Sequence, residues 1–153
     1  MGAVIVKMKD EHYETENDMK NLLQYIAAEG SNRQTETLLK SRGKGVSPKP
    51  VKAARQMQAV QRIYGKESRR RMYHLVVSFL EGMKKKAAIL RAAEEIADLL
   101  FENYQVFYGI HTSTENWHIH YAVNAVNYNT GKKWHQSKKE FGEMKEKICR
   151  LAR

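Results

Sequence analysis

The pattern that most constrains the fold of this chain is a pair of strand-like segments joined by a short polar connection. Residues 104–111 and 117–127 are rich in β-branched and aromatic side chains, and the five residues 112–116 between them are polar. Segments of this kind with so short a connection are expected to pair as an antiparallel hairpin. Because side chains alternate along a strand, His118 and His120 project from one face, and the hairpin brings His111 across from them.

The remaining patterns predict further strands and helices around this hairpin. In a strand over residues 72–79, alternation places Tyr73 on one face and His74 on the other. The order of elements favours an α+β fold with a central, largely antiparallel β-sheet flanked by α-helices. The other expected elements are a strand over 3–8, a helix from residue 15 or 17 to Gly30, helices over 83–101 and 137–151, and a helix-compatible segment over 51–64.

The chain is expected to form a single domain over residues 1–153, since about 150 residues is a common domain size. Residues 30–50 are rich in Ser, Gly, Lys and Arg and contain both prolines, which predicts a flexible basic loop rather than a domain boundary. The only cysteine, Cys149, excludes an internal disulfide and fits a reducing cytoplasm. No segment approaches the roughly 20 apolar residues of a membrane span, so we expect cytoplasmic localisation without membrane insertion.

The charge balance points to a polyanionic partner. The chain has 27 Lys and Arg against 17 Asp and Glu, a formal net charge of +10. Nucleic acid is the commonest partner of so basic a chain, and the alternative is a charged surface that serves only solubility.

The three histidines of the hairpin suggest a metal site. A lone His-x-His pair also occurs on polar sheet faces and among hydrogen-bonded core residues. The third histidine favours a metal, and three neutral nitrogen ligands leave open positions, as in a catalytic site. On a basic domain such a metal suggests Lewis acid catalysis on a phosphodiester. His74 is interpreted as a structural strand residue, with a site role as the alternative, and His135 as a surface or DNA-facing residue.

The attacking group in such a reaction comes from water or from a side chain. The chain contains 8 tyrosines, and the ordinary pKa of tyrosine, about 10, lies well below that of a sugar hydroxyl. A phosphotyrosine link is therefore reversible by a DNA 3′-OH.

These motifs resemble the relaxase and mobilization nuclease family, part of the HUH endonucleases, which are named for a His-hydrophobe-His motif such as His118-Ile119-His120. Residues 22–26, 73–79 and 123–133 also carry the resemblance. The resemblance implies an antiparallel sheet with flanking helices. It also implies a metal-dependent, site- and strand-specific DNA nickase that forms a 5′-phosphotyrosine bond at an origin of transfer and is able to rejoin strands.

Carried over to this sequence, the resemblance makes His111, His118 and His120 the metal ligands and Tyr25, in the first helix, the nucleophile. The tyrosine precedes the histidines, whereas in the replication initiators and transposases that share them it follows. Helical geometry places Tyr25 beside the apolar stripe of its helix, where an ordinary boundary aromatic would also lie. Tyr13 is the second candidate nucleophile.

Two departures from the family pattern bear on activity. Ser113 stands where relatives often have an aspartate that orients a ligand, and such carboxylates raise ligand basicity. Glu115 is a candidate substitute, and Asn124 is a further candidate for supporting the ligands. The chain is also shorter than relaxases commonly are, so we expect either a minimal protein or the nuclease domain of a longer one.

The expected substrate is single-stranded or hairpin DNA at an origin of transfer, with accessory relaxosome proteins and a coupling protein as further partners. Imidazole ligands suit Mn²⁺ or Zn²⁺ and Mg²⁺ prefers oxygen, so Mn²⁺ is favoured over Mg²⁺ on the ligands alone. Trp117 is expected in the core, because it faces away from the histidines. The candidate DNA contacts are Arg69, Arg70, Arg71, Lys132, Lys133 and Trp134.

Two other functions remain open at this point. One is a metal-dependent phosphoesterase or nuclease that activates water and forms no covalent intermediate. The other is an inactive DNA-binding accessory module, which the loss of the aspartate at Ser113 makes conceivable.

Overall fold

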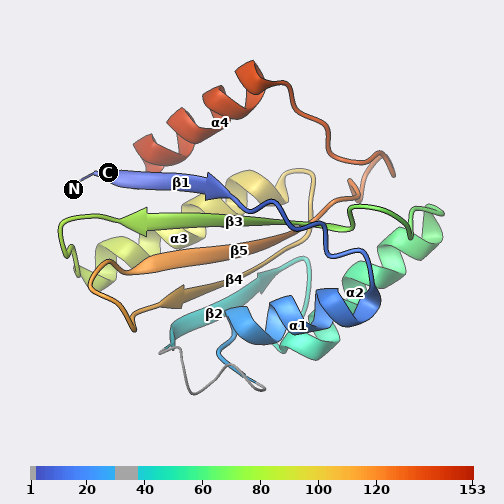
Figure 1. The fold of residues 1–153 in the computed structure, drawn as a ribbon, viewed down its shortest axis with the longest axis horizontal. Coiled ribbons are helices and arrows are strands. Elements are labelled where there is room, and N and C mark those ends of the chain that lie inside the picture. Colours follow the sequence, from blue (N-terminus) through green and yellow to red (C-terminus); the bar gives the residue numbers. More distant parts are fainter. Residues whose placement is uncertain (1–2, 30–37) are drawn as a thin grey trace.

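The computed structural model describes residues 3–29 and 38–153. Within these ranges the chain forms five strands and four helices (Figure 1). In chain order they are β1 (Val4–Met8), α1 (Glu16–Ile26), β2 (Leu38–Lys44), α2 (Pro50–Ile63), β3 (Met72–Phe79), α3 (Lys86–Phe101), β4 (Val106–His111), β5 (His118–Asn124) and α4 (Lys138–Leu151).

The strands form one antiparallel sheet in the order β1-β3-β5-β4-β2. β4 and β5 pair as the predicted hairpin, with His111 directly opposite His118. The α+β fold with a central antiparallel sheet is therefore confirmed. β3, which is distant from β5 in sequence, lies beside it and pairs His74 with Ala122.

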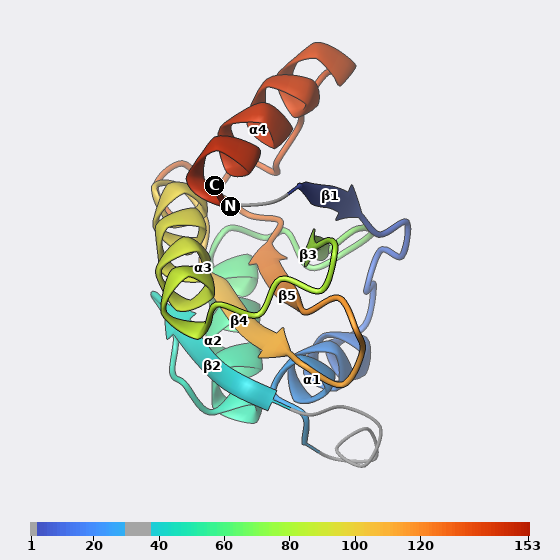
Figure 2. The ribbon, with the colours of Figure 1, turned by 90° about the vertical axis from the view of Figure 1, so that its left-hand side faces the viewer.

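The two faces of the sheet are covered by different helices, and Figure 2 shows α3 and α1 on opposite sides of it. One face packs Leu75, Tyr108 and Ile119 against α3 and α4. The other packs Met72 and Phe107, together with Ala122, against α1 and α2. The histidines of the hairpin share this second face, because His118, His120 and Ala122 alternate along β5.

Helix α1 forms where its sequence predicts it. Thr15 caps its first turn reciprocally with Asp18, and each side chain accepts from the other's backbone N–H. The apolar stripe is fully turned inward: Leu23, for example, is 0% exposed, and burying such a side chain contributes about 1.5–3 kcal/mol. The helix ends at Ile26, earlier than expected, with Ala28 in the left-handed region at φ 55°. Gly30, the predicted end, lies outside the described residues.

The predicted basic loop over 30–50 needs correction. Residues 38–44 form strand β2 at the edge of the sheet, and α2 begins at Pro50. The strand is held by backbone pairing with β4 and by ion pairs of its cations, so it needs no apolar pattern. Arg42 and Lys44 form ion pairs with Glu94 of α3 at 3.0 and 2.7 Å. The first part of that loop, 30–37, lies outside the described residues.

None of the helices within 3–29 and 38–153 is both long and apolar enough to cross a membrane.

Candidate metal centre and tyrosine site

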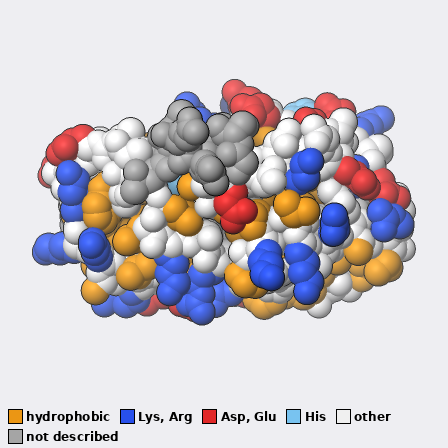
Figure 3. Space-filling view, turned by 90° about the horizontal axis from the view of Figure 1, so that it is seen from below, with side chains coloured by type: hydrophobic (Ala, Val, Ile, Leu, Met, Phe, Trp, Pro, Cys, Tyr) orange, Lys and Arg blue, Asp and Glu red, His pale blue; other side chains and the backbone are white. Residues whose placement is uncertain are grey.

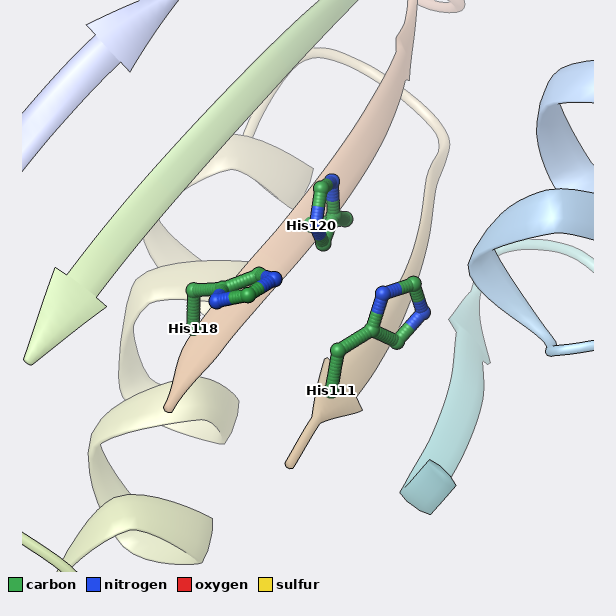
Figure 4. A group of neighbouring side chains, drawn as sticks. All are labelled: His111, His118 and His120. Carbon is green, nitrogen blue, oxygen red and sulfur yellow. The ribbon is translucent and has the colours of Figure 1, made fainter. Parts of the chain in front are cut away.

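Three histidines converge above the sheet, as the alternation predicts. His118 and His120 project from β5 and His111 from the end of β4, and their rings point toward a common space (Figure 4). One ligand nitrogen from each lies within 4.8 Å of the others. These three residues could therefore hold a metal ion.

Hydrogen bonds to backbone carbonyls define the protonation of two of these rings. Nδ1 of His118 lies 3.0 Å from the carbonyl oxygen of Asn116, and Nε2 of His111 lies 2.9 Å from that of Ile26. A carbonyl oxygen only accepts, so each of these nitrogens carries the proton. The lone pair is then on Nε2 of His118 and on Nδ1 of His111, and this neutral form is the one that ligates a metal.

The contact between His111 and Ile26 depends on a glycine. Gly109 pairs with His120 in the sheet, and a Cβ at position 109 would lie 2.2 Å from the carbonyl oxygen of Ile26. Only a residue without a side chain lets the end of α1 approach β4 this closely. Gly109 therefore allows α1 to bring both Ile26 and Tyr25 to the histidines.

His74 lies at the site and is therefore more than a structural strand residue. Its Nε2 lies 2.7 Å from Nδ1 of His120, and its Nδ1 lies 3.0 Å from the hydroxyl of Tyr13. The pairing of β3 with β5 creates this contact. Burial, reinforced by Lys9 and His111, lowers the pKa of His74 to about 4. Burial also lowers the pKa of His120, with His111 as the next cause. Both rings are neutral at pH 7.

The donor set fits a divalent metal. Nε2 of His120 is buried and has no hydrogen-bond partner among the described residues. A buried polar atom in this state is rare and calls for an explanation such as an ion. Three neutral imidazoles are ligands for Mn²⁺, Zn²⁺ and related ions.

Tyr25 meets the histidines edge-on. Its ring centroid is 5.2 Å from that of His111 and 5.3 Å from that of His120. It lines a cavity of about 640 Å³ whose wall also includes Lys9, Tyr13, His74 and His120. The cavity has room for a phosphodiester beside the tyrosine.

Tyr13, the second candidate nucleophile, faces the same cavity, and its hydroxyl has a perturbed pKa. Burial and the nearby Glu11 carboxylate raise the pKa of its hydroxyl well above the ordinary value. A raised pKa disfavours the phenolate that attacks phosphorus, which counts against Tyr13 as the nucleophile.

The three residues predicted to orient the histidines, Ser113, Glu115 and Asn124, are exposed or contact other groups. The carboxylate of Glu115 is 80% exposed and lies 3.5 Å from Lys84, because the loop after β4 points it into solvent. Ser113 is exposed in the same loop. Asn124 is buried at the far end of β5, where its amide bonds to Gln61, Gln105 and the carbonyl of Met57. It thus satisfies a polar cluster under α2 instead of orienting a histidine.

Three of the predicted DNA contacts make contacts within the fold. Lys133 donates to the carbonyls of Ser68 and Arg70 at 2.6 Å, and Arg71 is buried against Gln61. Trp134 is 8% exposed and stacks on Tyr104 in the core. These three side chains are thus engaged in contacts within the fold, and their role as DNA contacts stays a prediction.

The other predicted DNA contacts differ in exposure. Arg70 lies 4.0 Å over the ring of Tyr73 and donates to the carbonyl of Lys9. Arg69, Lys132 and His135 are exposed. Trp117 packs partly buried against the core, as expected.

Sequence reasoning missed two lysines, Lys7 on β1 and Lys9 just after it. Lys7 pairs with Val76 and therefore shares the face that carries His74 and His120, and Lys9 lines the cavity. Their position follows from the pairing of β1 with β3, which no local pattern reveals. Figure 3 shows Lys and Arg spread among acidic residues over the visible part of the side that carries α1 and β2, with no single continuous basic patch there.

Comparisons with known proteins bear on this geometry. A family model described as "Relaxase: MobA/VirD2-like, nuclease domain" matches residues 25–153. "Protein rlx" of Staphylococcus aureus is 31% identical over 91 residues, which cover 58% of this chain and 29% of that protein. "Protein TraI" of Escherichia coli is 45% identical over 56 residues, 35% of this chain and 8% of that protein. The chain thus spans less than a third of the length of these curated relatives.

A solved structure described as "Molecular Basis of Vancomycin Resistance Transfer in Staphylococcus aureus" has the same fold. Its TM-score is 0.70, and the likeness covers 99% of this chain and 91% of that one. At 13% identity the likeness concerns the fold alone.

Proposed function

We propose that this chain, which belongs to the MobA/VirD2-like relaxase nuclease family, nicks one DNA strand by transesterification at Tyr25. The Tyr25 hydroxyl loses its proton and attacks the scissile phosphorus. The bond from phosphorus to the 3′ oxygen breaks, and that oxygen leaves as a protonated 3′-OH. The 5′-phosphate becomes an ester of Tyr25, and the reverse reaction rejoins the strand.

The position of Tyr25 carries this proposal. Its ring lies edge-on to His111 and His120 and beside a cavity large enough for a phosphodiester. A nucleophile held next to the ligands of a metal is within reach of a phosphate that the same metal binds.

The three histidines would hold the divalent ion, with Mn²⁺ or Mg²⁺ as the expected ion and Zn²⁺ as a third candidate. When bound, the ion supplies Lewis acid polarisation of a non-bridging phosphate oxygen.

The proposed substrate is single-stranded or hairpin DNA at an origin of transfer. Lys7 and Lys9 lie on the face that carries the histidines and are suited to contact the phosphates on either side of the scissile one. Accessory relaxosome proteins and a coupling protein in the cytoplasm are the proposed partners.

A denaturing gel tests the reaction. Purified protein is incubated with Mn²⁺ or Mg²⁺ and end-labelled single-stranded oligonucleotides from candidate transfer origins. We expect the label to shift to protein size in the wild type and in Tyr73→Phe, and to remain free in Tyr25→Phe and after EDTA treatment. Tyr73 is a matched control, because its hydroxyl contacts Trp134 on the opposite face of the sheet.

Two outcomes would contradict the proposal. Free cleaved product without an adduct would indicate a phosphoesterase that uses activated water. Binding of the oligonucleotides without cleavage under any metal would indicate an accessory module.

A further inference from the structure

A row of hydrogen-bonded rings leads away from the metal ligands into the wall of the cavity. The hydroxyl of Tyr13 lies 3.0 Å from Nδ1 of His74, and Nε2 of His74 lies 2.7 Å from Nδ1 of His120. Both histidines are 4% exposed, so bulk water does not compete for these bonds. The row uses one nitrogen of His120 and leaves its Nε2 for another partner.

The direction of the protons in this row follows from its inner end. Nε2 of His120 is buried and has no hydrogen-bond partner among the described residues, and a buried N–H without an acceptor is rarer than an unused lone pair. This places the lone pair of His120 on Nε2 and its proton on Nδ1, which donates to Nε2 of His74 at 2.7 Å. Nδ1–H of His74 in turn donates to the hydroxyl of Tyr13 at 3.0 Å, and the hydroxyl keeps its own proton for the cavity that Tyr13 lines.

We propose that Tyr13 and His74 are positioning residues that hold His120 in the tautomer with its proton on Nδ1, so that Nε2 presents its lone pair to the metal. The inference rests on the metal site of the proposed function. Nε2 of His120 is the buried atom that lacks a hydrogen-bond partner among the described residues. In the opposite tautomer that nitrogen would carry a proton and could not ligate.

The segment that carries Tyr13 is fixed from several sides. The backbone N–H of Lys9 donates to the carbonyl of His74, and that of Arg71 donates to the carbonyl of His12. Tyr13 itself is held at φ 53°, a left-handed conformation that is uncommon for a residue other than glycine. Such conformations persist where the surrounding structure imposes them, and they concentrate at functional sites.

The row of hydrogen-bonded rings from Tyr13 through His74 to His120, called the relay below, gives His120 an orienting partner that the hairpin loop does not provide. Ser113 and Glu115 are exposed and leave the ligands without a carboxylate from that side. Tyr13 also lies outside the segment that the family model matches, which begins at residue 25.

Manganese affinity tests the relay without DNA. Free Mn²⁺ is followed by electron paramagnetic resonance during titration of metal-free wild type, Tyr13→Phe, His74→Leu and the double variant. Loss of a group that orients a metal-bound histidine typically weakens binding by about 10–100-fold. We expect a loss in that range for His74→Leu and a smaller loss for Tyr13→Phe. The double variant should bind no more weakly than His74→Leu, because both changes break one chain.

Matched controls separate positioning from loss of structure. Tyr73→Phe removes a hydroxyl from the residue directly before His74 in β3, on the opposite face of the sheet. This variant should keep its Mn²⁺ affinity within twofold of wild type. Tyr13→Phe keeps the ring and its packing, so it remains informative if His74→Leu does not fold. A Mn²⁺ affinity of Tyr13→Phe and His74→Leu equal to that of wild type would overturn the relay.

The tautomer is measured directly by nitrogen NMR of the histidine side chains in the metal-free protein. We expect His120 with its proton on Nδ1 in the wild type and a mixture of tautomers in Tyr13→Phe. A wild-type His120 protonated on Nε2 would overturn the relay even if the protein forms the DNA adduct. The expected tautomer in a protein that forms no adduct would support the relay and count against the proposed function alone.

Discussion

At the scale of single residues, the site depends on small features with large consequences. One of these is the absence of a side chain at Gly109. The carbonyl oxygen of Ile26 occupies the space that a Cβ there would need, at 2.2 Å, and the same oxygen accepts from Nε2–H of His111. The glycine thus links the end of α1, the orientation of a ligand and the position of Tyr25.

We therefore expect Gly109→Ala to lower the free energy of unfolding by about 1–3 kcal/mol through overpacking, and to weaken Mn²⁺ binding as well. Urea denaturation and Mn²⁺ titration measure the two effects. Gly142→Ala is the matched control: nothing lies within 4 Å of its Cβ in α4, and alanine should stabilise that helix by about 0.5–1 kcal/mol. A Gly109→Ala protein as stable as wild type and with equal Mn²⁺ affinity would contradict this account.

The sequence was sufficient to predict that three histidines converge and insufficient to predict the residues packed against them. His111, His118 and His120 converge because strand alternation and a short loop impose it, and Tyr25 lies where the helical period places it. His74 is different, since its contact with His120 requires β3 to lie beside β5. The burial of Trp134 likewise comes from packing between distant segments, which local patterns do not encode.

At the scale of elements, edge strand β2 shows why a basic, glycine-containing segment is easily taken for a loop. It is held by backbone pairing with β4 and by charges, because Lys44 contacts Glu94 at 2.7 Å and Asp98 at 3.1 Å. A hydrogen bond from Lys44 holds the pKa of Glu94 below its ordinary value of 4.5. The pair is partly exposed, so its contribution is at most about 1 kcal/mol.

The depressed pKa of Glu94 gives a pH dependence with a definite sign. A carboxyl that is more acidic in the folded state stabilises the fold above pH 4.5, and this contribution is lost as the pH falls through the folded pKa. We expect Glu94→Gln to be slightly less stable than wild type near pH 7 and the difference to shrink below pH 4.5. Denaturation across pH measures it. A difference that grows on acidification would contradict the assignment.

At the scale of the whole molecule, only some of the cations behind the net charge of +10 are available to contact a partner. Lys133, Arg71 and Lys44 are engaged in internal contacts. Lys7 is exposed on the face of the sheet that carries the histidines, and Lys9 lines the cavity. Total charge therefore indicates a polyanionic partner, while the position of particular cations indicates where it would lie.

We expect Lys7→Ala and Lys9→Ala each to weaken binding of single-stranded DNA and to reduce the slope of log K against log salt by about 0.7. Fluorescence anisotropy at several salt concentrations measures both quantities. Lys145→Ala is the control, because that lysine lies over Phe141 on α4. Equal losses in all three variants would show that only net charge matters.

The most direct test of the account identifies the tyrosine that carries DNA. The covalent adduct is digested with nuclease and trypsin, and the nucleotide-bearing peptide is sequenced by mass spectrometry. The account predicts the modification at Tyr25, in the tryptic peptide of residues 21–33. Modification at Tyr13, in the peptide of residues 10–20, would contradict both the assignment of the nucleophile and the positioning role of Tyr13.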